Sequence, residues 1–257
     1  MDTVTSADGT TIAYERLGDG PPLVFVSGAL CHRAVTRQHA EHLGRSFTVI
    51  NYDRRGRGDS GDTAQFAIER EVEDVAALIE AAGGSAAVYG HSSGAALALH
   101  AARDGLPITR LIAHEPPFAP EQTDAEREEQ RRANQRLYSL IDSGDRVGAL
   151  RLHFAGTGMP AEIVDPMCED VETQRIAHTL RYDYAQIDGW GDDPAARAGE
   201  ISVPTLLVNG GESPQWMIDV AKRFADAVPD GHHRVVPGHG HVISPDALTP
   251  VVEEFLR

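Results

Sequence analysis

Residues 90–94 read Gly-His-Ser-Ser-Gly, a pattern that can place a serine for nucleophilic attack. The residues before them, 86–89, are apolar, and residues 95–102 have the composition of a helix. A serine at a tight turn between strand and helix is held in a strained backbone conformation that exposes its hydroxyl, and the flanking glycines let the chain reverse. Ser92 is therefore the candidate nucleophile.

A serine hydroxyl is a weak nucleophile at neutral pH, so Ser92 needs a base. The chain has 12 histidines, two of which, His239 and His241, lie in the glycine-containing segment 236–242. His91 lies beside Ser92 in the sequence, and we interpret it as a packing or hydrogen-bonding residue. His153 is interpreted as a residue of the surface or of an inserted helical segment.

An acid that orients the base completes such a site, and Glu115 is the favoured candidate. It follows the apolar run 108–113, and catalytic groups gather at the carboxyl ends of strands in open α/β sheets. Two prolines after it restrict the local chain. The order Ser92, Glu115, His241 agrees with the order serine, acid, histidine. Glu212 as the acid, or a dyad without an acid, remain alternatives.

The elements that would position these residues alternate along the chain. Apolar runs predict strands at 22–26, 47–52, 86–89, 108–113, 204–208 and 234–236, and segments 3–7 and 10–15 predict a hairpin. Helical patterns at 68–82, 216–228 and 247–256 separate several of these strands. Such alternation predicts an α/β protein with a mostly parallel central sheet and helices on both faces.

Between residues 119 and 198 the alternation stops. Residues 123–126 resemble a capping box that opens a charged helix up to Ile141, and helical patterns follow near 146–154 and 168–184. We interpret 119–198 as a helical lid inserted into a core formed by 1–118 and 199–257.

Composition limits the classes of partner. The formal net charge of −16 argues against nucleic acid and anionic membranes, which bind basic patches. Two distant cysteines, Cys31 and Cys168, favour a reducing compartment. We expect a cytoplasmic protein, because the sequence shows no signal peptide and no long apolar segment. Oligomeric state is left open.

With this arrangement the chain resembles the α/β-hydrolase fold superfamily over nearly its whole length. The features that carry the resemblance are the turn at 90–94, the segment Asp53–Ser60 (DRRGRGDS), the turn Ser27-Gly28, and Gly240-His241. The segment 53–60 is interpreted as a structural loop. The resemblance implies His241 as the base and a helical lid over the site. It also implies an aspartate where this chain has Ser213, so the acid placement is similar to that of zearalenone-type lactone hydrolases.

The resemblance further implies an oxyanion hole made by the backbone N–H groups of Ala29 and Ser93. Trp190, Tyr184, Phe118 and Phe154 are the expected substrate-binding residues, with Leu137, Met159 and Tyr182 as further candidates. An aromatic pocket suits a hydrophobic ester or lactone.

The favoured function is a carboxylesterase or lactonase type of serine hydrolase that acts on a small or medium ester or lactone through an acyl-enzyme. Hydrolysis or lysis of a carbon–carbon bond on the same triad, or a non-catalytic receptor for a small molecule, are the alternatives. No metal is expected, because acyl transfer needs only these groups, and no dinucleotide-binding motif is present.

Overall fold

Eight strands form one sheet in the computed structural model, which describes residues 1–63, 65–157 and 159–257. The strands are β1 (Asp2–Thr5), β2 (Thr11–Leu17), β3 (Pro22–Val26), β4 (Thr48–Tyr52), β5 (Ala86–His91), β6 (Ile108–His114), β7 (Thr205–Gly210) and β8 (Gly231–Val236). Their order is β1-β2-β4-β3-β5-β6-β7-β8. The hairpin β1–β2 joins β4 antiparallel, and the remaining pairs are parallel. This agrees with the α/β fold expected from the alternating pattern.

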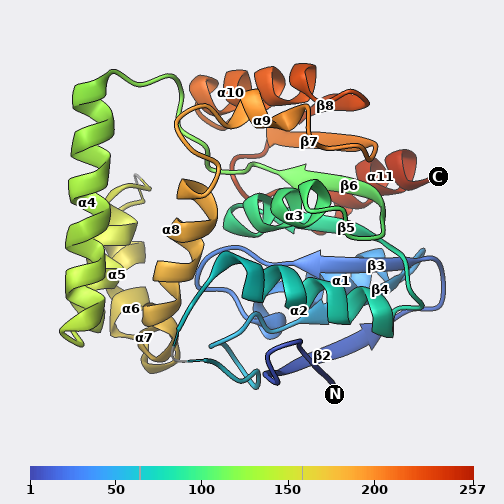
Figure 1. Ribbon diagram of the computed structural model, residues 1–257, viewed down its shortest axis with the longest axis horizontal. Helices are drawn as coiled ribbons and strands as arrows, with labels where there is room; N and C mark the ends of the chain where they lie inside the picture. The colour runs from blue at the N-terminus through green and yellow to red at the C-terminus, as the bar shows by residue number, and fades with distance from the viewer. Residues whose placement is uncertain (64, 158) are drawn as a thin grey trace.

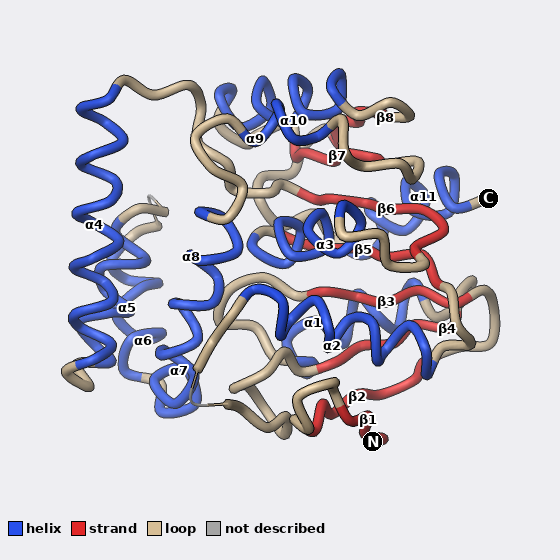
Figure 2. Tube along the Cα trace, in the orientation of Figure 1, coloured by secondary structure: helices blue, strands red, loops and turns tan. Residues whose placement is uncertain are grey.

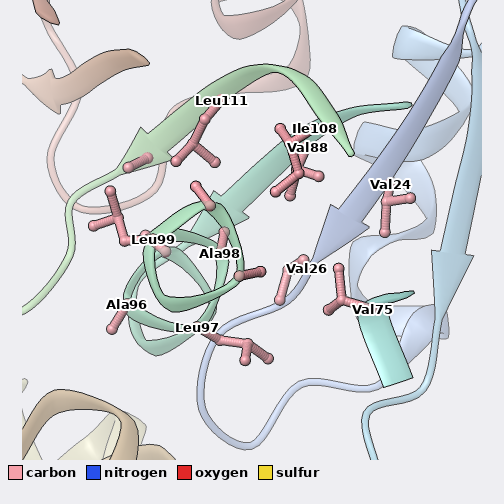
Figure 3. Close-up of a cluster of buried hydrophobic side chains, with 14 of the residues drawn as sticks. Val24, Val26, Val75, Val88, Ala96, Leu97, Ala98, Leu99, Ile108 and Leu111 are labelled. Carbon is pink, nitrogen blue, oxygen red and sulfur yellow. The ribbon is translucent and has the colours of Figure 1, made fainter. Parts of the chain in front are cut away.

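Helices cover both faces of the sheet (Figure 1). On one face lie α2 (Ile68–Ala81), α3 (Ser93–Arg103) and α10 (Gln215–Ala227), and on the other lie α1 (Arg33–Leu43) and α11 (Pro245–Leu256). Successive strand residues point to opposite faces, so Val24 and Val26 pack toward α3, whereas Leu23 and Phe25 pack toward α1 and α11. Each face of the sheet thus has its own hydrophobic core. Figure 3 shows the core on the α3 face, in which small and branched side chains of α3 pack against β3, β5 and β6.

Several helices separate β6 from β7. They are α4 (Asp124–Asp142), α5 (Arg146–Ala155), α6 (Ala161–Glu169), α7 (Val171–Ile176), α8 (Leu180–Asp188) and α9 (Pro194–Ala198). Most of them stand together at the side toward which the parallel strands point, whereas α9 lies beside α10 (Figures 1 and 2). A hydrophobic core of their own joins α4, α5, α6 and α8. We call α4–α8 the insertion, because α9 packs with the core instead.

Local chemistry explains where the insertion helices begin. Thr123 accepts a hydrogen bond from the Glu126 backbone, and the Glu126 side chain accepts one from the Thr123 backbone, so the expected capping box is present. The single helix expected over 168–184 is instead broken at Asp170. That residue is extended, and its side chain accepts a hydrogen bond from Thr173 to begin α7. None of the helices in the described ranges combines the length and hydrophobicity needed to cross a membrane.

Candidate active site

Ser92 occupies a strained turn between β5 and α3. Its φ of 56° and ψ of −125° lie outside the regions that ordinary residues adopt. A Cβ on Gly90 would come within 2.5 Å of the Gly94 carbonyl oxygen, and one on Gly94 within 2.4 Å of the Ser27 carbonyl oxygen. Both positions therefore require glycine, and the strand–turn–helix context expected for this pattern is present.

His241 and Glu115 come together from loops 126 residues apart. His241 Nδ1 lies 2.6 Å from Glu115 Oε2, and Glu115 is fully buried. This contact assigns the Nδ1 proton to the hydrogen bond with the carboxylate and leaves Nε2 as the ring nitrogen free to accept a proton. The base and acid named from the sequence are thus juxtaposed in the structure.

The turn after β7 orients Glu115. Its Oε1 accepts hydrogen bonds from the Gly210 backbone N–H at 2.9 Å and from the Ser213 hydroxyl at 2.5 Å. Burial by itself raises the pKa of Glu115, but the hydrogen bonds from His241, Ser213 and Gly210 outweigh it and hold the pKa below 4.5. Ser213, where the family resemblance implied an aspartate, is therefore a hydrogen-bond donor to Glu115 in this structure.

Glu212, the alternative acid, is exposed, and its backbone N–H donates to the His239 carbonyl oxygen. His239, the alternative base, is held away from the site by contacts of its ring with the Pro237 carbonyl oxygen and the Ser244 hydroxyl. In the described part of the chain, no hydrogen bond joins the side chain of Glu212 or His239 to Glu115 or His241.

His91, next to Ser92 in the turn after β5, forms a hydrogen bond with the loop that carries His241. His91 Nε2 donates to the His241 carbonyl oxygen at 3.0 Å, and the two rings lie 4.8 Å apart. Burial and the nearby His241 lower the pKa of His91 to about 3, so its ring is neutral. Among the hydrogen bonds of the described residues, none joins the Ser92 hydroxyl to His241. Such catalytic bonds are often long in free enzymes and tighten when substrate binds.

The loop after β3 approaches the nucleophile closely. A Cβ on Gly28 would lie 3.1 Å from Ser92 Cβ, so only glycine fits without displacement. Leu30, two residues on, has a φ of 55°, and Glu115 has a φ of 48°. Together with Ser92 they are the three non-glycine residues of the described chain with positive φ, so backbone strain collects around this site.

The arginine-rich loop after β4 binds the loop after β3 and the start of α3, through Arg54 and Arg57. Arg54 and Arg57 are fully buried and bind Asp183 of α8, with distances of 2.8 Å for both. Arg54 also pairs with Glu71 of α2 at 2.7 Å. The sequence pattern predicts a structural loop at 53–60 and does not identify Asp183 as its partner. Three arginines directly after a buried strand were a signal for buried carboxylate partners, since buried charges are paired.

Two of the expected substrate-binding residues do not line the site. Trp190 and Phe118 lie in the hydrophobic core that includes α3 and α10, where each ring centroid is 5.5 Å from that of Phe224. Trp190 also donates from Nε1 to the Ala96 carbonyl oxygen at 3.3 Å. Their assignment to substrate binding is wrong, because side chains with 0% and 1% exposed surface cannot reach a ligand.

The other expected substrate-binding residues belong to the insertion. Phe154 and Leu137 are buried in its core, Tyr182 stacks on Phe66 with centroids 4.1 Å apart, and Met159 is exposed. Tyr184 is half-buried, and its hydroxyl lies 3.3 Å from His153 Nδ1. Tyr184 also packs against the same insertion core as Ala29 and Leu30. Of the four residues named for substrate binding, Phe154 and Tyr184 thus share the insertion core with Ala29 and Leu30 of the loop after β3, and Tyr184 is the less buried of the two.

The placement of Trp190 predicts a stability effect. Trp190→Ala is expected to lower the free energy of unfolding by about 3–5 kcal/mol, because it removes a fully buried side chain from a packed core. Chemical denaturation monitored by circular dichroism measures this change. The matched control is Trp216→Ala, whose side chain is 42% exposed and whose loss is expected to cost about 0.5 kcal/mol or less. Equal losses for the two variants would contradict the core placement.

Comparisons with known proteins agree with this fold. A model of the alpha/beta hydrolase family matches residues 23–254. A non-heme chloroperoxidase of Streptomyces lividans is 40% identical over 99 residues, which are 37% of this chain and 36% of that protein. An N-formylmaleamate deformylase of Pseudomonas putida is 35% identical over 119 residues, 44% of each chain. The matched stretches therefore span less than half the length of these curated relatives.

A solved structure is similar over the complete chain. It is an alpha/beta hydrolase from Sphaerobacter thermophilus, 46% identical, with 100% of both chains covered and a TM-score of 0.85.

Proposed function

Because the chain belongs to the alpha/beta hydrolase family, we propose that it is a serine hydrolase that cleaves a small or medium hydrophobic ester or lactone. The observation that carries this proposal is the contact between His241 and the buried Glu115, which prepares a base near the strained Ser92 turn. A base oriented by a buried carboxylate is what an acyl-transfer serine requires.

The proposed reaction has two halves. Ser92 Oγ attacks the substrate carbonyl carbon while its proton passes to His241 Nε2, and the carbonyl oxygen becomes an oxyanion. When the carbon–oxygen bond of the ester breaks, His241 returns the proton to the departing alcohol oxygen. Water then attacks the acyl-enzyme in the same way, with His241 as base, and releases the acid and free Ser92.

The oxyanion is held by the backbone N–H groups of Ser93 and Ala29 in this proposal. Ser93 begins α3, where the unpaired N–H groups and the helix dipole favour negative charge. Glu115 stabilises the imidazolium that forms on His241 and keeps Nε2 directed away from itself. The partly buried apolar side chains of Ala29, Leu30 and Tyr184, which pack against the insertion core, support a hydrophobic acyl or alcohol group in this proposal.

A fluorophosphonate probe tests the proposal directly. The native protein is expected to form a covalent adduct, and mass spectrometry of the digested protein should place the adduct on the peptide that contains Ser92. Ser92→Ala, checked for native circular dichroism, should lose the label. A folded native protein that neither takes the label nor hydrolyses p-nitrophenyl esters would overturn the proposal and favour a non-catalytic receptor.

A further inference from the structure

Asp183 is a fully buried residue on insertion helix α8. Its carboxylate binds the side chain of Ser93, one proposed oxyanion donor, and Arg57, which binds the loop that carries the other donor, Ala29. Its Oδ1 accepts hydrogen bonds from the Ser93 hydroxyl at 2.6 Å and from Arg57 Nη2 at 2.8 Å. Its Oδ2 also accepts from Arg57 Nη2 at 2.8 Å, and Arg54 Nη1 donates to Oδ1 at 2.8 Å. The carboxylate is therefore surrounded by donors, none of which belongs to the Ser92–His241–Glu115 set.

Arg57 carries the connection from Asp183 to the loop after β3. Its Nη1 donates to the Gly28 carbonyl oxygen at 2.7 Å and to the Cys31 carbonyl oxygen at 3.3 Å. The Gly28 carbonyl and the Ala29 N–H belong to one planar trans peptide, in which the two groups point in opposite directions. Holding the carbonyl on the arginine side therefore fixes the direction of the Ala29 N–H.

The second donor is fixed more directly. The Ser93 hydroxyl donates to Asp183 and accepts from Arg54 Nη1 at 3.2 Å, so its side chain is held on both sides. The N–H that we assign to the oxyanion hole belongs to this same residue. Arg54 Nη1 additionally donates to the Ser27 carbonyl oxygen at 3.2 Å, which adds a contact to the β3 loop.

The charges within this group balance. Arg54 and Arg57 are paired with Glu71 and Asp183, and each of the four side chains is at most 1% exposed. Burial by itself raises the pKa of Asp183, but Arg57, Arg54 and the Ser93 hydroxyl lower it below its ordinary value, so the carboxylate is charged. These four buried charged side chains hold one another in fixed positions, because moving any one of them would leave an unpaired charge in the protein interior, which is costly.

From these contacts we propose that Asp183 is a positioning residue for the oxyanion hole, and that it makes the alignment of Ala29 and Ser93 depend on the seating of the insertion. The inference rests on the function proposed above. Asp183 touches no reacting atom. It acts through Arg57 on one donor and through the Ser93 side chain on the other, so its loss disturbs transition-state stabilisation more than substrate binding.

The chain offers a matched control for this proposal. Asp74, on α2, is 1% exposed and pairs with Arg55, the arginine between the other two, at 2.6 Å and 2.8 Å. Arg55 also contacts Asp8 and Thr63, and it has no hydrogen bond to the β3 loop in the described structure. Asp183→Asn and Asp74→Asn thus each remove one buried negative charge from an arginine of the same loop.

The experiment measures kcat and KM for p-nitrophenyl butyrate in both variants. Asp183→Asn is expected to lower kcat about 100-fold with KM nearly unchanged, as when one oxyanion donor is lost. Asp74→Asn is expected to keep the native kcat per folded molecule. The midpoint of the pH profile of kcat/KM should be the same in Asp183→Asn as in the native protein, because the Glu115–His241 pair is untouched.

Arg57→Lys provides a milder second variant in case Asp183→Asn does not fold. Lysine keeps the positive charge beside Asp183 but lacks the fork that spans Asp183 and the Gly28 carbonyl, so kcat is expected to fall about 10-fold. Amide hydrogen exchange gives a readout that does not need turnover. Exchange in residues 27–31 should accelerate in Asp183→Asn and in Arg57→Lys, and remain native in Asp74→Asn.

Two results would overturn the inference: kcat falling equally in Asp183→Asn and Asp74→Asn, or native exchange at residues 27–31 in both Asp183→Asn and Arg57→Lys. Failure of the proposed function looks different, because then the native protein itself takes no fluorophosphonate label. In that case the exchange measurement still decides whether Asp183 positions the β3 loop.

Discussion

Alanine at Ser92 or at His241 is expected to lower kcat about 10⁶-fold, and alanine at both positions is expected to lower it little further. The reason is that the two residues perform one step together. Without His241 the Ser92 hydroxyl keeps its proton, and without Ser92 the imidazole has no nucleophile to activate. The measurement is steady-state turnover of p-nitrophenyl butyrate by the two single variants and the double variant.

His239→Ala is the control for this prediction. His239 lies on the same loop as His241, but its ring contacts the Pro237 carbonyl oxygen and the Ser244 hydroxyl. Its replacement should leave kcat near the native value. A large loss in His239→Ala together with a small loss in His241→Ala would show that the base had been assigned to the wrong histidine.

Glu115→Gln is expected to lower kcat about 10⁴-fold while the protein remains folded. The donors around the carboxylate decide the orientation of the new amide. Gly210 N–H and the Ser213 hydroxyl both donate to the Oε1 position, so the glutamine oxygen must stay there. The amide NH₂ then faces His241 Nδ1, which must accept, and the ring proton moves to Nε2. A protonated Nε2 cannot take the proton of Ser92.

Glu212→Gln and Ser213→Ala are the comparisons for Glu115→Gln. Glu212 is exposed, so its neutralisation should leave kcat close to native. Ser213→Ala removes one of the hydrogen bonds to Glu115 Oε1 but leaves the carboxylate charged and in contact with His241, so a smaller loss is expected. A greater loss in Glu212→Gln than in Glu115→Gln would place the acid after β7.

The fold, Ser92 and Glu115 were predictable because their signals are local, whereas His241 was distinguished from His239 only by the family resemblance. Apolar runs predict buried strands directly, and the two glycines that the turn at residues 90–94 requires lie within the turn itself. Glu115 could be chosen over Glu212 because it directly follows a strand predicted to be buried. Helix α1 was missed, since its mean hydropathy is low and it buries only a narrow stripe, Thr36, Ala40 and Leu43.

Contacts between distant segments were not predictable. Arg54 and Arg57 meet Asp183 across 129 and 126 residues, and the sequence contains 39 acidic residues that could have been their partners. Trp190 and Phe118 were misassigned for the same reason. An aromatic side chain gains free energy equally from a core and from a binding pocket, and its sequence neighbours do not tell which surface it meets.

The register of β5 and β6 has a consequence for how variation in this chain can be tolerated. His91 and His114 are paired neighbours in the sheet, and Ser92 and Glu115 are the residues that immediately follow them. Nucleophile and acid therefore leave adjacent strands at the same level, and both precede the insertion in the chain. A change in the length of residues 119–198 cannot shift one against the other. The chain returns from the insertion through β7, and the turn after that strand meets the acid through two neutral donors, Gly210 N–H and the Ser213 hydroxyl. Length variation in the insertion is therefore compatible with this site as long as β7 keeps its register beside β6.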